Sequence, residues 1–224
     1  SGGDAGGVGA PTVSSPLPTA LYIHVPWCVR KCPYCDFNSH HLRGELPATE
    51  YVDALLEDLR LDLEQQPWPG GDLTSIFIGG GTPSLLPAKE LGRLLEGVAR
   101  LVPCPQPLEI TLEANPEDMT KAQIQTWLGL GVTRLSLGVQ SFHDETLAWM
   151  NRAHTGVQAE RAIRLAHDLG VKAMTLDLIY GVPTSRDWND DIARATALPI
   201  QHLSAYALTV EPGTVLGTRV ERGA

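Results

Sequence analysis

The chain has 224 residues, of which 43% are hydrophobic and 19% are charged, and its formal net charge is −9. This length suits one large α/β domain or two small ones, and the negative charge argues against broad binding to nucleic acids or anionic membranes. No apolar run reaches the roughly 18 residues that a transmembrane helix needs, and the N-terminus lacks the pattern of a signal peptide. The four cysteines do not resemble a secreted disulfide framework. We therefore expect a cytoplasmic protein without a transmembrane segment.

Short apolar runs alternate with helical patterns after an N-terminal stretch that is rich in Gly, Ser and Pro. That stretch, residues 1–18, is predicted to be a disordered arm. Thr49 is a plausible N-cap for the first helix, and Thr120 with Gln123 forms a capping-box pattern for the third. Strands are predicted over residues 21–25, 73–78, 108–113, 135–139, 171–179 and 202–208. Helices are predicted around residues 52–63, 91–102, 121–129, 143–150, 156–169 and 188–198.

Strands that alternate with helices imply right-handed crossovers and a parallel sheet. Six strands connected in this way predict an α/β fold, an incomplete (β/α)6 barrel over residues 19–224, rather than the full eight units. A doubly wound open sheet is the alternative. In both folds, ligands bind at the carboxyl ends of the strands, so residues that follow the predicted strands are the candidates for a functional site.

Three cysteines, Cys28, Cys32 and Cys35, form a CxxxCxxC pattern in the loop after the first predicted strand. Zinc sites and ordinary iron–sulfur sites close with four ligands, so three thiolates leave one position open. The spacing is compatible with a cubane iron–sulfur cluster that keeps one iron free of protein ligands. It is also compatible with a zinc site completed by His24 or His40, and with three unrelated thiols.

The second predicted strand ends in a glycine-rich turn, "GGGTP", formed by Gly79, Gly80, Gly81 and Thr82. Glycines let the backbone approach a ligand closely. The turn lacks the GK[ST] sequence of a phosphate-binding loop, and a plain turn between strand and helix is the alternative. Taken alone, the motif is therefore a weak signal.

Three polar side chains, Glu113, Gln140 and Asp177, lie at or near the ends of three further predicted strands. Because the strand ends meet on one face of a barrel, these side chains are expected to converge on a ligand. A structural or surface role is the alternative for each of them.

Several motifs in order make the chain resemble the radical S-adenosylmethionine (SAM) superfamily: "YIHVPWC…KCPYCDFNSH", "IFIGGGTPS", "LEANPE", "RLSLGVQSF", "NRAH" and "DLIYGVP". They are similar to the branch that contains the oxygen-independent coproporphyrinogen III oxidases and the HemW heme chaperones. The resemblance runs from about residue 20 to the C-terminus. It implies a 4Fe-4S cluster on Cys28, Cys32 and Cys35, whose fourth iron is chelated by SAM. The reduced cluster would supply the electron that cleaves SAM homolytically.

The resemblance also implies which residues bind SAM. The turn at 79–82 would contact the methionyl amine. Glu113, Gln140 and Asp177 would hydrogen-bond the amine and the ribose hydroxyls, and Arg152 would pair with the carboxylate through a bidentate fork. Further SAM contacts are implied at Tyr22, Tyr34 and Ala207.

Within this branch, the oxidases carry an additional cysteine two positions after the third cluster ligand, where this sequence has Phe37. They also have a longer structured N-terminal arm. The resemblance therefore favours a HemW-like chaperone, which binds heme and transfers it to acceptor hemoproteins, over an oxidase. A non-enzymatic metal-binding module is a third possibility.

Cys104 is expected to be structural. The C-terminal domain of this branch is expected to be absent from the chain, and its oligomeric state is left open.

Overall fold

The computed structural model describes residues 19–68, 71–105, 108–184 and 187–223, so the predicted arm at residues 1–18 lies outside the described residues. Within them, six strands form one parallel sheet in the order β1-β4-β5-β6-β7-β8. These strands are β1 (Thr19–Val25), β4 (Leu73–Gly80), β5 (Glu109–Ala114), β6 (Arg134–Gln140), β7 (Ala173–Tyr180) and β8 (His202–Ala207). Two further strands of two residues each, β2 (Trp27–Cys28) and β3 (His40–His41), pair with each other in the loop after β1.

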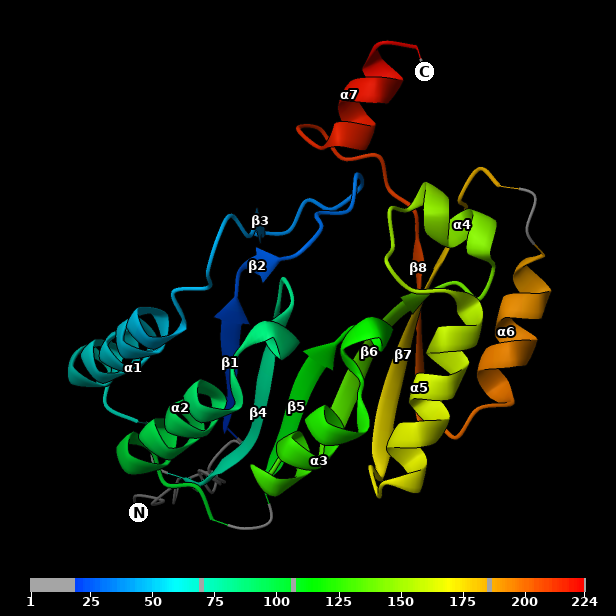
Figure 1. The fold of residues 1–224 in the computed structure, drawn as a ribbon. Coiled ribbons are helices and arrows are strands. Elements are labelled where there is room, and N and C mark those ends of the chain that lie inside the picture. Colours follow the sequence, from blue (N-terminus) through cyan, green and yellow to red (C-terminus); the bar gives the residue numbers. More distant parts are fainter. Residues whose placement is uncertain (1–18, 69–70, 106–107, 185–186, 224) are drawn as a thin grey trace, which may run out of the picture.

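The helices cover one face of the sheet and gather at one of its ends. Figure 1 shows α1, α2, α3, α5 and α6 along the outer face, whereas α4, α7 and the loop with β2 and β3 lie where the strands end. The α-helices are α1 (Ala48–Gln65), α2 (Ala88–Leu101), α3 (Lys121–Gly129), α4 (Asp144–Trp149), α5 (Gly156–Asp168), α6 (Trp188–Thr196) and α7 (Val215–Glu221). Short 3-10 turns, η1 (Pro83–Leu85) and η2 (Pro116–Asp118), follow β4 and β5.

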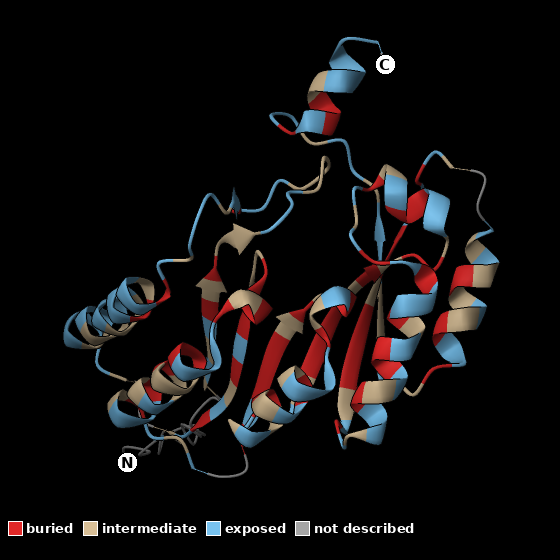
Figure 2. Cartoon of the chain, viewed as in Figure 1, coloured by how far each residue is buried: buried red, intermediate tan, exposed pale blue. Residues whose placement is uncertain are grey.

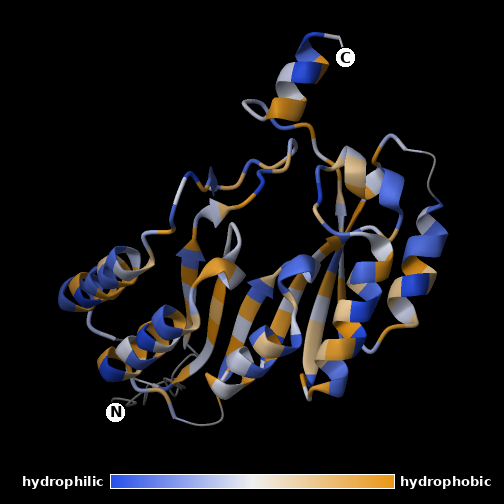
Figure 3. Ribbon diagram, viewed as in Figure 1, coloured by the Kyte–Doolittle hydropathy of each residue, from blue (hydrophilic) through white to orange (hydrophobic). Residues whose placement is uncertain are grey.

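The two faces of the sheet differ because successive residues of a strand point in opposite directions. The face beneath the helices is apolar, and its buried side chains dominate the core (Figures 2 and 3). Core side chains from the four central strands include Ile76, Ile78, Ile110, Leu112, Leu135, Leu137, Val139, Met174, Leu176 and Leu178. The opposite face carries polar side chains such as Glu113, Ser136 and Asp177 in the alternate positions. The sheet therefore has a closed apolar side and a polar side on which a ligand can lie.

The predicted incomplete barrel is confirmed. All six strands are parallel and follow one another across the sheet in chain order, and β1 and β8 lie at its two ends. The doubly wound alternative is wrong, because that fold requires the strand order to reverse at a switch point. Each predicted strand is present within about two residues of its expected bounds.

One local expectation is wrong, and one helix was not predicted. Thr49 is not the N-cap of α1, since the helix begins at Ala48 after Pro47 and the Thr49 hydroxyl instead donates to Glu90. The helix α7 was not predicted, although Thr214 accepts a hydrogen bond from the Gly217 N–H at its start. Its seven residues are too few for hydrophobic periodicity to identify a helix.

Candidate functional site

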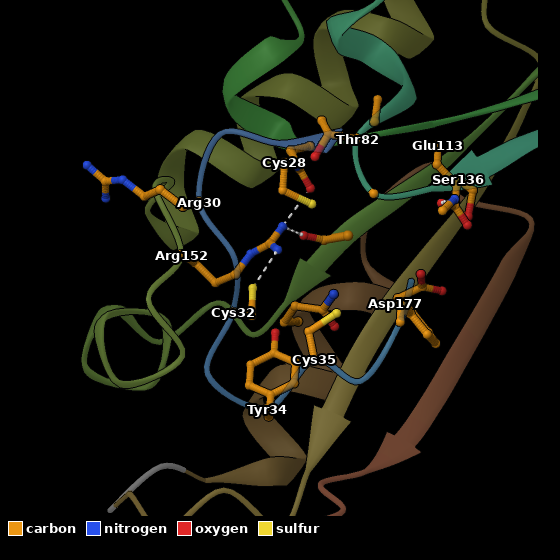
Figure 4. Close-up of a pocket in the computed structure, with 17 residues that line it drawn as sticks. Cys28, Arg30, Cys32, Tyr34, Cys35, Thr82, Glu113, Ser136, Arg152 and Asp177 are labelled. Carbon is orange, nitrogen blue, oxygen red and sulfur yellow. Dashed lines mark hydrogen bonds between the residues drawn. The ribbon is translucent and has the colours of Figure 1, made fainter. Parts of the chain in front are cut away.

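A pocket lies at the carboxyl ends of the strands, between the cysteine loop and the polar face of the sheet (Figure 4). It brings together most of the site residues that the sequence predicted, from segments up to 149 residues apart. Predicted residues that line it are Cys28, Cys32, Tyr34, Cys35, Gly80, Gly81, Thr82, Glu113, Gln140, Arg152 and Asp177. Residues that the sequence reasoning missed are Arg30, Ala114, Asn115, Ser136 and Gly138, and Phe37 also lines the pocket.

The base of the cysteine loop is held by backbone hydrogen bonds from the turn after β4. The Gly81 N–H donates to the Val25 carbonyl at 2.7 Å, and the Thr82 N–H donates to the Trp27 carbonyl at 2.7 Å. The pairing of β2 with β3 closes the loop a few residues further on. The first cysteine therefore leaves the sheet in a direction that the neighbouring strand fixes.

The glycines of this turn are required by the protein's own packing. A Cβ atom on Gly81 would lie 2.6 Å from the Trp27 carbonyl oxygen. One on Gly79 would lie 2.7 Å from the Phe77 ring and 3.0 Å from the Glu113 carboxylate. Gly79 is not among the residues that line the pocket. Gly79 therefore lies beside the pocket lining, and its nearest neighbours are side chains of the sheet itself.

Two half-buried carboxylates face the pocket from adjacent parts of the sheet. Glu113 accepts a hydrogen bond from the Gly80 N–H at 2.9 Å. Burial, with a smaller contribution from the charge of Asp177, raises the pKa of Glu113 to about 7. Burial likewise raises the pKa of Asp177 to about 6, although the Ser204 hydroxyl opposes the shift. Because desolvation disfavours both carboxylate charges, a cationic group in the pocket would be attracted here.

Arg152 brings a guanidinium group to the opposite side of the pocket. Its Nη2 donates to Asn115 Oδ1 at 2.7 Å and to the Gly138 carbonyl at 2.6 Å, and its Nη1 lies 3.5 Å from Cys32 Sγ (Figure 4). The bidentate fork expected for a ligand carboxylate is thus partly engaged by the protein's own acceptors. The Nε atom is buried and has no hydrogen-bond partner among the described residues.

Gln140 ends β6 in an uncommon conformation. Its φ is +69°, in the left-handed region that few non-glycine residues adopt. The ladder between β6 and β7 shifts register between Leu137 and Gln140. The side-chain atom Gln140 Oε1 is buried without a partner in the described part of the chain. Buried polar atoms without partners are costly, so Gln140 and Arg152 both fit a pocket that receives a polar ligand.

The three cysteines of the loop are free thiols that line the same pocket. The Cys35 N–H donates to the Cys32 carbonyl at 3.1 Å, which forms a tight turn between the last two thiols. Burial raises the pKa of Cys28, and the nearby Cys35 and Cys32 raise it further. A positive partner such as a metal would therefore favour the thiolate form of Cys28.

A single zinc ion gains no clear fourth ligand from the predicted histidines. The His24 Nδ1 lies 2.9 Å from the Tyr22 hydroxyl and its Nε2 lies 2.7 Å from the Asn38 carbonyl. His40 is exposed. Within the described residues, no three His, Cys, Asp or Glu side chains lie close enough together to hold one metal ion. Cys104 lies away from the pocket and donates to the Val102 carbonyl at 3.2 Å, as a structural residue would.

Two predicted SAM contacts lie outside the pocket. Tyr22 is 58% exposed and stacks on Phe77 with ring centroids 6.1 Å apart. Ala207 is exposed at the end of β8. Neither lines the pocket. Tyr34 does, and it also packs against a small second core around Met150 and Ile179, which attaches the cysteine loop to the far side of the sheet.

Among the missed residues, Asn115 had a sequence signal. It follows β5 directly in "LEANPE", at the position where ligand-binding side chains of a parallel sheet are expected. Ser136 and Gly138 lie within β6, and only the strand register shows that they face the polar side.

Burial also raises the pKa of Tyr34, with the charge of Cys32 adding to the effect.

A family model described as the radical SAM superfamily matches residues 22–195. The chain belongs to this superfamily. Membership implies a 4Fe-4S cluster and SAM as cofactors. The donor set fits them, because three thiols, a partly free guanidinium and two carboxylates meet at one pocket.

Curated relatives within the superfamily carry the name heme chaperone HemW. The chain is 46% identical to one from Escherichia coli over 204 residues, which are 90% of this chain and 53% of the relative. It is 35% identical to one from Bacillus subtilis, with 91% of this chain and 54% of the relative covered. The chain thus spans about half the length of the curated relatives it matches. No helix in the described segments is long and apolar enough to cross a membrane.

Solved structures agree on the fold. Coproporphyrinogen III oxidase (HemN) from Escherichia coli, described as a radical SAM enzyme, superposes with a TM-score of 0.80 at 26% identity, over 90% of this chain and 46% of its own. Elp3 from the archaeon Methanocaldococcus infernus superposes with a TM-score of 0.63 at 19% identity, over 92% of this chain and 50% of its own, which bears on the fold alone.

The raised pKa of Glu113 predicts that the free energy of unfolding depends on pH. The neutral Glu113 side chain contributes its full stability below pH 4.5, and this contribution is lost as the pH rises toward 7, because the carboxyl group ionises at a lower pH in the unfolded chain than in the folded protein. In Glu113→Gln, the free energy of unfolding should fall less between these pH values than in the parent chain. The difference should be about 1–2 kcal/mol, after a discount for partial exposure.

Urea unfolding of the metal-free protein at a series of pH values measures this difference. Glu109→Gln, at the exposed opposite end of the same strand, is the matched control and should leave the pH dependence unchanged. Identical pH profiles for Glu113→Gln and the parent chain would show that Glu113 is not held in its neutral form.

Proposed function

We propose that residues 19–224 form the 4Fe-4S- and SAM-binding core of a heme chaperone similar to HemW, with Cys28, Cys32 and Cys35 as the cluster ligands. One observation carries the proposal: three thiols of one loop face the same pocket as a guanidinium and two half-buried carboxylates. A cluster on three thiolates keeps one iron open for a small molecule. When bound, it supplies that open position and one electron.

The remaining pocket residues suit the two charged ends of SAM. Glu113 and Asp177 offer negative charge to its amine and ribose side, and the turn at Gly80–Thr82 offers backbone groups. Arg152 keeps Nε and part of Nη1 for an anionic group, while Asn115 and the Gly138 carbonyl hold its orientation. Orientation of this kind is the part that a protein contributes to cofactor chemistry.

Heme binding and transfer to acceptor hemoproteins are proposed from the names of the relatives, which are about twice as long as this chain. Phe37 supports the chaperone over the oxidase. It lines the pocket and is 65% exposed at the position where the oxidases carry an additional cysteine. We also propose a cytoplasmic location, since the four cysteines are free thiols.

The cluster assignment predicts a clear pattern of iron content. After anaerobic reconstitution, Cys28→Ala, Cys32→Ala and Cys35→Ala should each lose the roughly four-iron cluster, because three thiolates are the minimum that holds it. Iron and sulfide analysis with electron paramagnetic resonance of the reduced protein measures this. Cys104→Ala is the control and should keep the cluster. Loss in Cys104→Ala with retention in Cys35→Ala would overturn the assignment.

Arg152 predicts a loss of SAM affinity. Lysine keeps the charge but cannot hold Asn115 and Gly138 while donating to a ligand, because it lacks the planar fork. Arg152→Lys should weaken SAM binding by about 1–3 kcal/mol, the scale of a charged hydrogen bond. Calorimetry on the reconstituted protein measures it. Arg164→Lys, exposed on α5, is the control. Unchanged affinity in Arg152→Lys would remove this residue from the site.

The chaperone proposal is tested by heme titration and transfer. Reconstituted protein should bind heme and pass it to an apo-hemoprotein, with the HemW from Escherichia coli as the positive comparison. Under anaerobic conditions with reductant, SAM and coproporphyrinogen III, no protoporphyrinogen IX should form, because the pocket has Phe37 in place of cysteine. Formation of stoichiometric protoporphyrinogen IX, above the amount in a no-protein control, would overturn the chaperone proposal and favour an oxidase.

A further inference from the structure

The backbone just beyond β6 is held in place by a carboxylate from another helix. Asp191, in the first turn of α6, is completely buried at 0% exposure. Its Oδ1 accepts the Phe142 N–H at 2.7 Å, and its Oδ2 accepts the Ser141 hydroxyl at 2.9 Å. These two residues directly follow Gln140. Because hydrogen bonds to an ionised acceptor are the strong ones, this contact fixes the chain immediately after the pocket.

Residues of α6 and α5 also contact the segment after Gln140, from two sides. Arg194, one turn further along α6, donates from Nη1 to the Phe142 carbonyl at 3.1 Å, and its guanidinium lies 5.1 Å from the centre of the Phe142 ring. At the start of α5, a Cβ on Gly156 would lie 1.9 Å from the Phe142 carbonyl oxygen, so α5 is pressed against this peptide. The segment after Gln140 therefore has little freedom to move.

Capping of α6 does not account for Asp191. The N-cap of α6 is Asp187, whose side chain already accepts the Asn189 N–H at 2.9 Å. A second, fully buried carboxylate at this helix start carries a desolvation cost that capping alone would not justify. Its carboxylate accepts from the Ser141 hydroxyl and the Phe142 N–H, and its Oδ1 also lies 3.8 Å from His143 Nε2, so it contacts three successive residues after β6. That backbone is where the chain turns through the left-handed conformation of Gln140 and where the ladder with β7 shifts register.

We propose that Asp191 is a positioning residue of the SAM pocket, which holds the side-chain amide of Gln140 toward the ligand through Ser141 and Phe142. Strained backbone persists where the surroundings over-determine it, and such strain gathers at ligand sites. Gln140 supplies the strained conformation and a buried Oε1 without a partner in the described residues. Asp191 supplies the anchor. The inference rests on the proposed function only in that SAM is the probe.

A double-mutant cycle tests this, with SAM affinity of the reconstituted protein measured by calorimetry. Asp191→Asn keeps the size of the side chain but presents an N–H₂ group to one of its two donors. It should weaken SAM binding about tenfold, the scale of one released strained residue. Gln140→Ala should weaken binding by a similar factor. Adding Asp191→Asn to Gln140→Ala should cause less than about a twofold further loss, because the group that Asp191 positions is gone.

The matched control is Asp190→Asn. Asp190 is the neighbouring carboxylate on α6 and pairs with His143 at 3.0 Å rather than with residues 141 and 142. It should leave SAM affinity within about twofold of the parent chain. Thermal unfolding is recorded for every variant. A merely structural role would lower the melting temperature to the same degree with or without Gln140, whereas the affinity effect should depend on Gln140.

Each outcome decides the matter. An equal affinity loss from Asp191→Asn in the parent and in Gln140→Ala would overturn the inference, as would unchanged affinity with a lowered melting temperature. If Asp191→Asn fails to fold, Ser141→Ala removes one of the two donors and should show the same dependence on Gln140, or the inference is wrong. If the parent chain with its cluster does not bind SAM, the proposed function fails and the inference fails with it. If the parent chain binds SAM but the effects of Asp191→Asn and Gln140→Ala are independent, the inference about Asp191 is wrong and the proposed function stands.

Discussion

The site depends on the backbone hydrogen bonds that join the turn after β4 to the residues after β1. Through them, Gly81 and Thr82 hold the carbonyls of Val25 and Trp27 and set the direction in which the cysteine loop leaves the sheet. The bonds form only if no side chain separates the two segments, since a Cβ on Gly81 would collide with the Trp27 carbonyl. The glycine motif therefore acts first on the loop that carries the thiols, and through the loop on the pocket.

The division of the sheet into two faces makes the pocket possible. Apolar side chains beneath the helices supply the core, so the opposite side chains of the same strands need not contribute to it. Glu113, Ser136 and Asp177 occupy those positions. A desolvated carboxylate there costs free energy, and burial accordingly raises the pKa of both Glu113 and Asp177. A cation that enters the pocket offsets this cost, so the same arrangement that weakens the fold favours the ligand.

Arg152 shows how a residue predicted for one role can have a second. Its position in "NRAH" indicated a ligand contact, yet two of its donors hold Asn115 and the Gly138 carbonyl, and a third approaches Cys32. The guanidinium thereby connects the cysteine loop to β5 and β6. A change at this position would disturb the thiols and the strand ends together, because one rigid planar group makes all of these contacts.

The sequence by itself determined the features that short stretches of chain encode. Apolar runs and helix periodicity predicted six parallel strands in chain order, and the spacing of Cys28, Cys32 and Cys35 predicted three thiols in one loop after the first strand. These succeed because strand and helix patterns repeat within a few residues. The tertiary structure alone decided that Tyr22 stacks on Phe77 outside the pocket lining, that Asn115 orients Arg152, and that Gln140 turns through the left-handed region. The reason is physical: the Gln140 conformation is anchored by Asp191, some 50 positions along the chain, and no local pattern in the sequence encodes a contact across that distance.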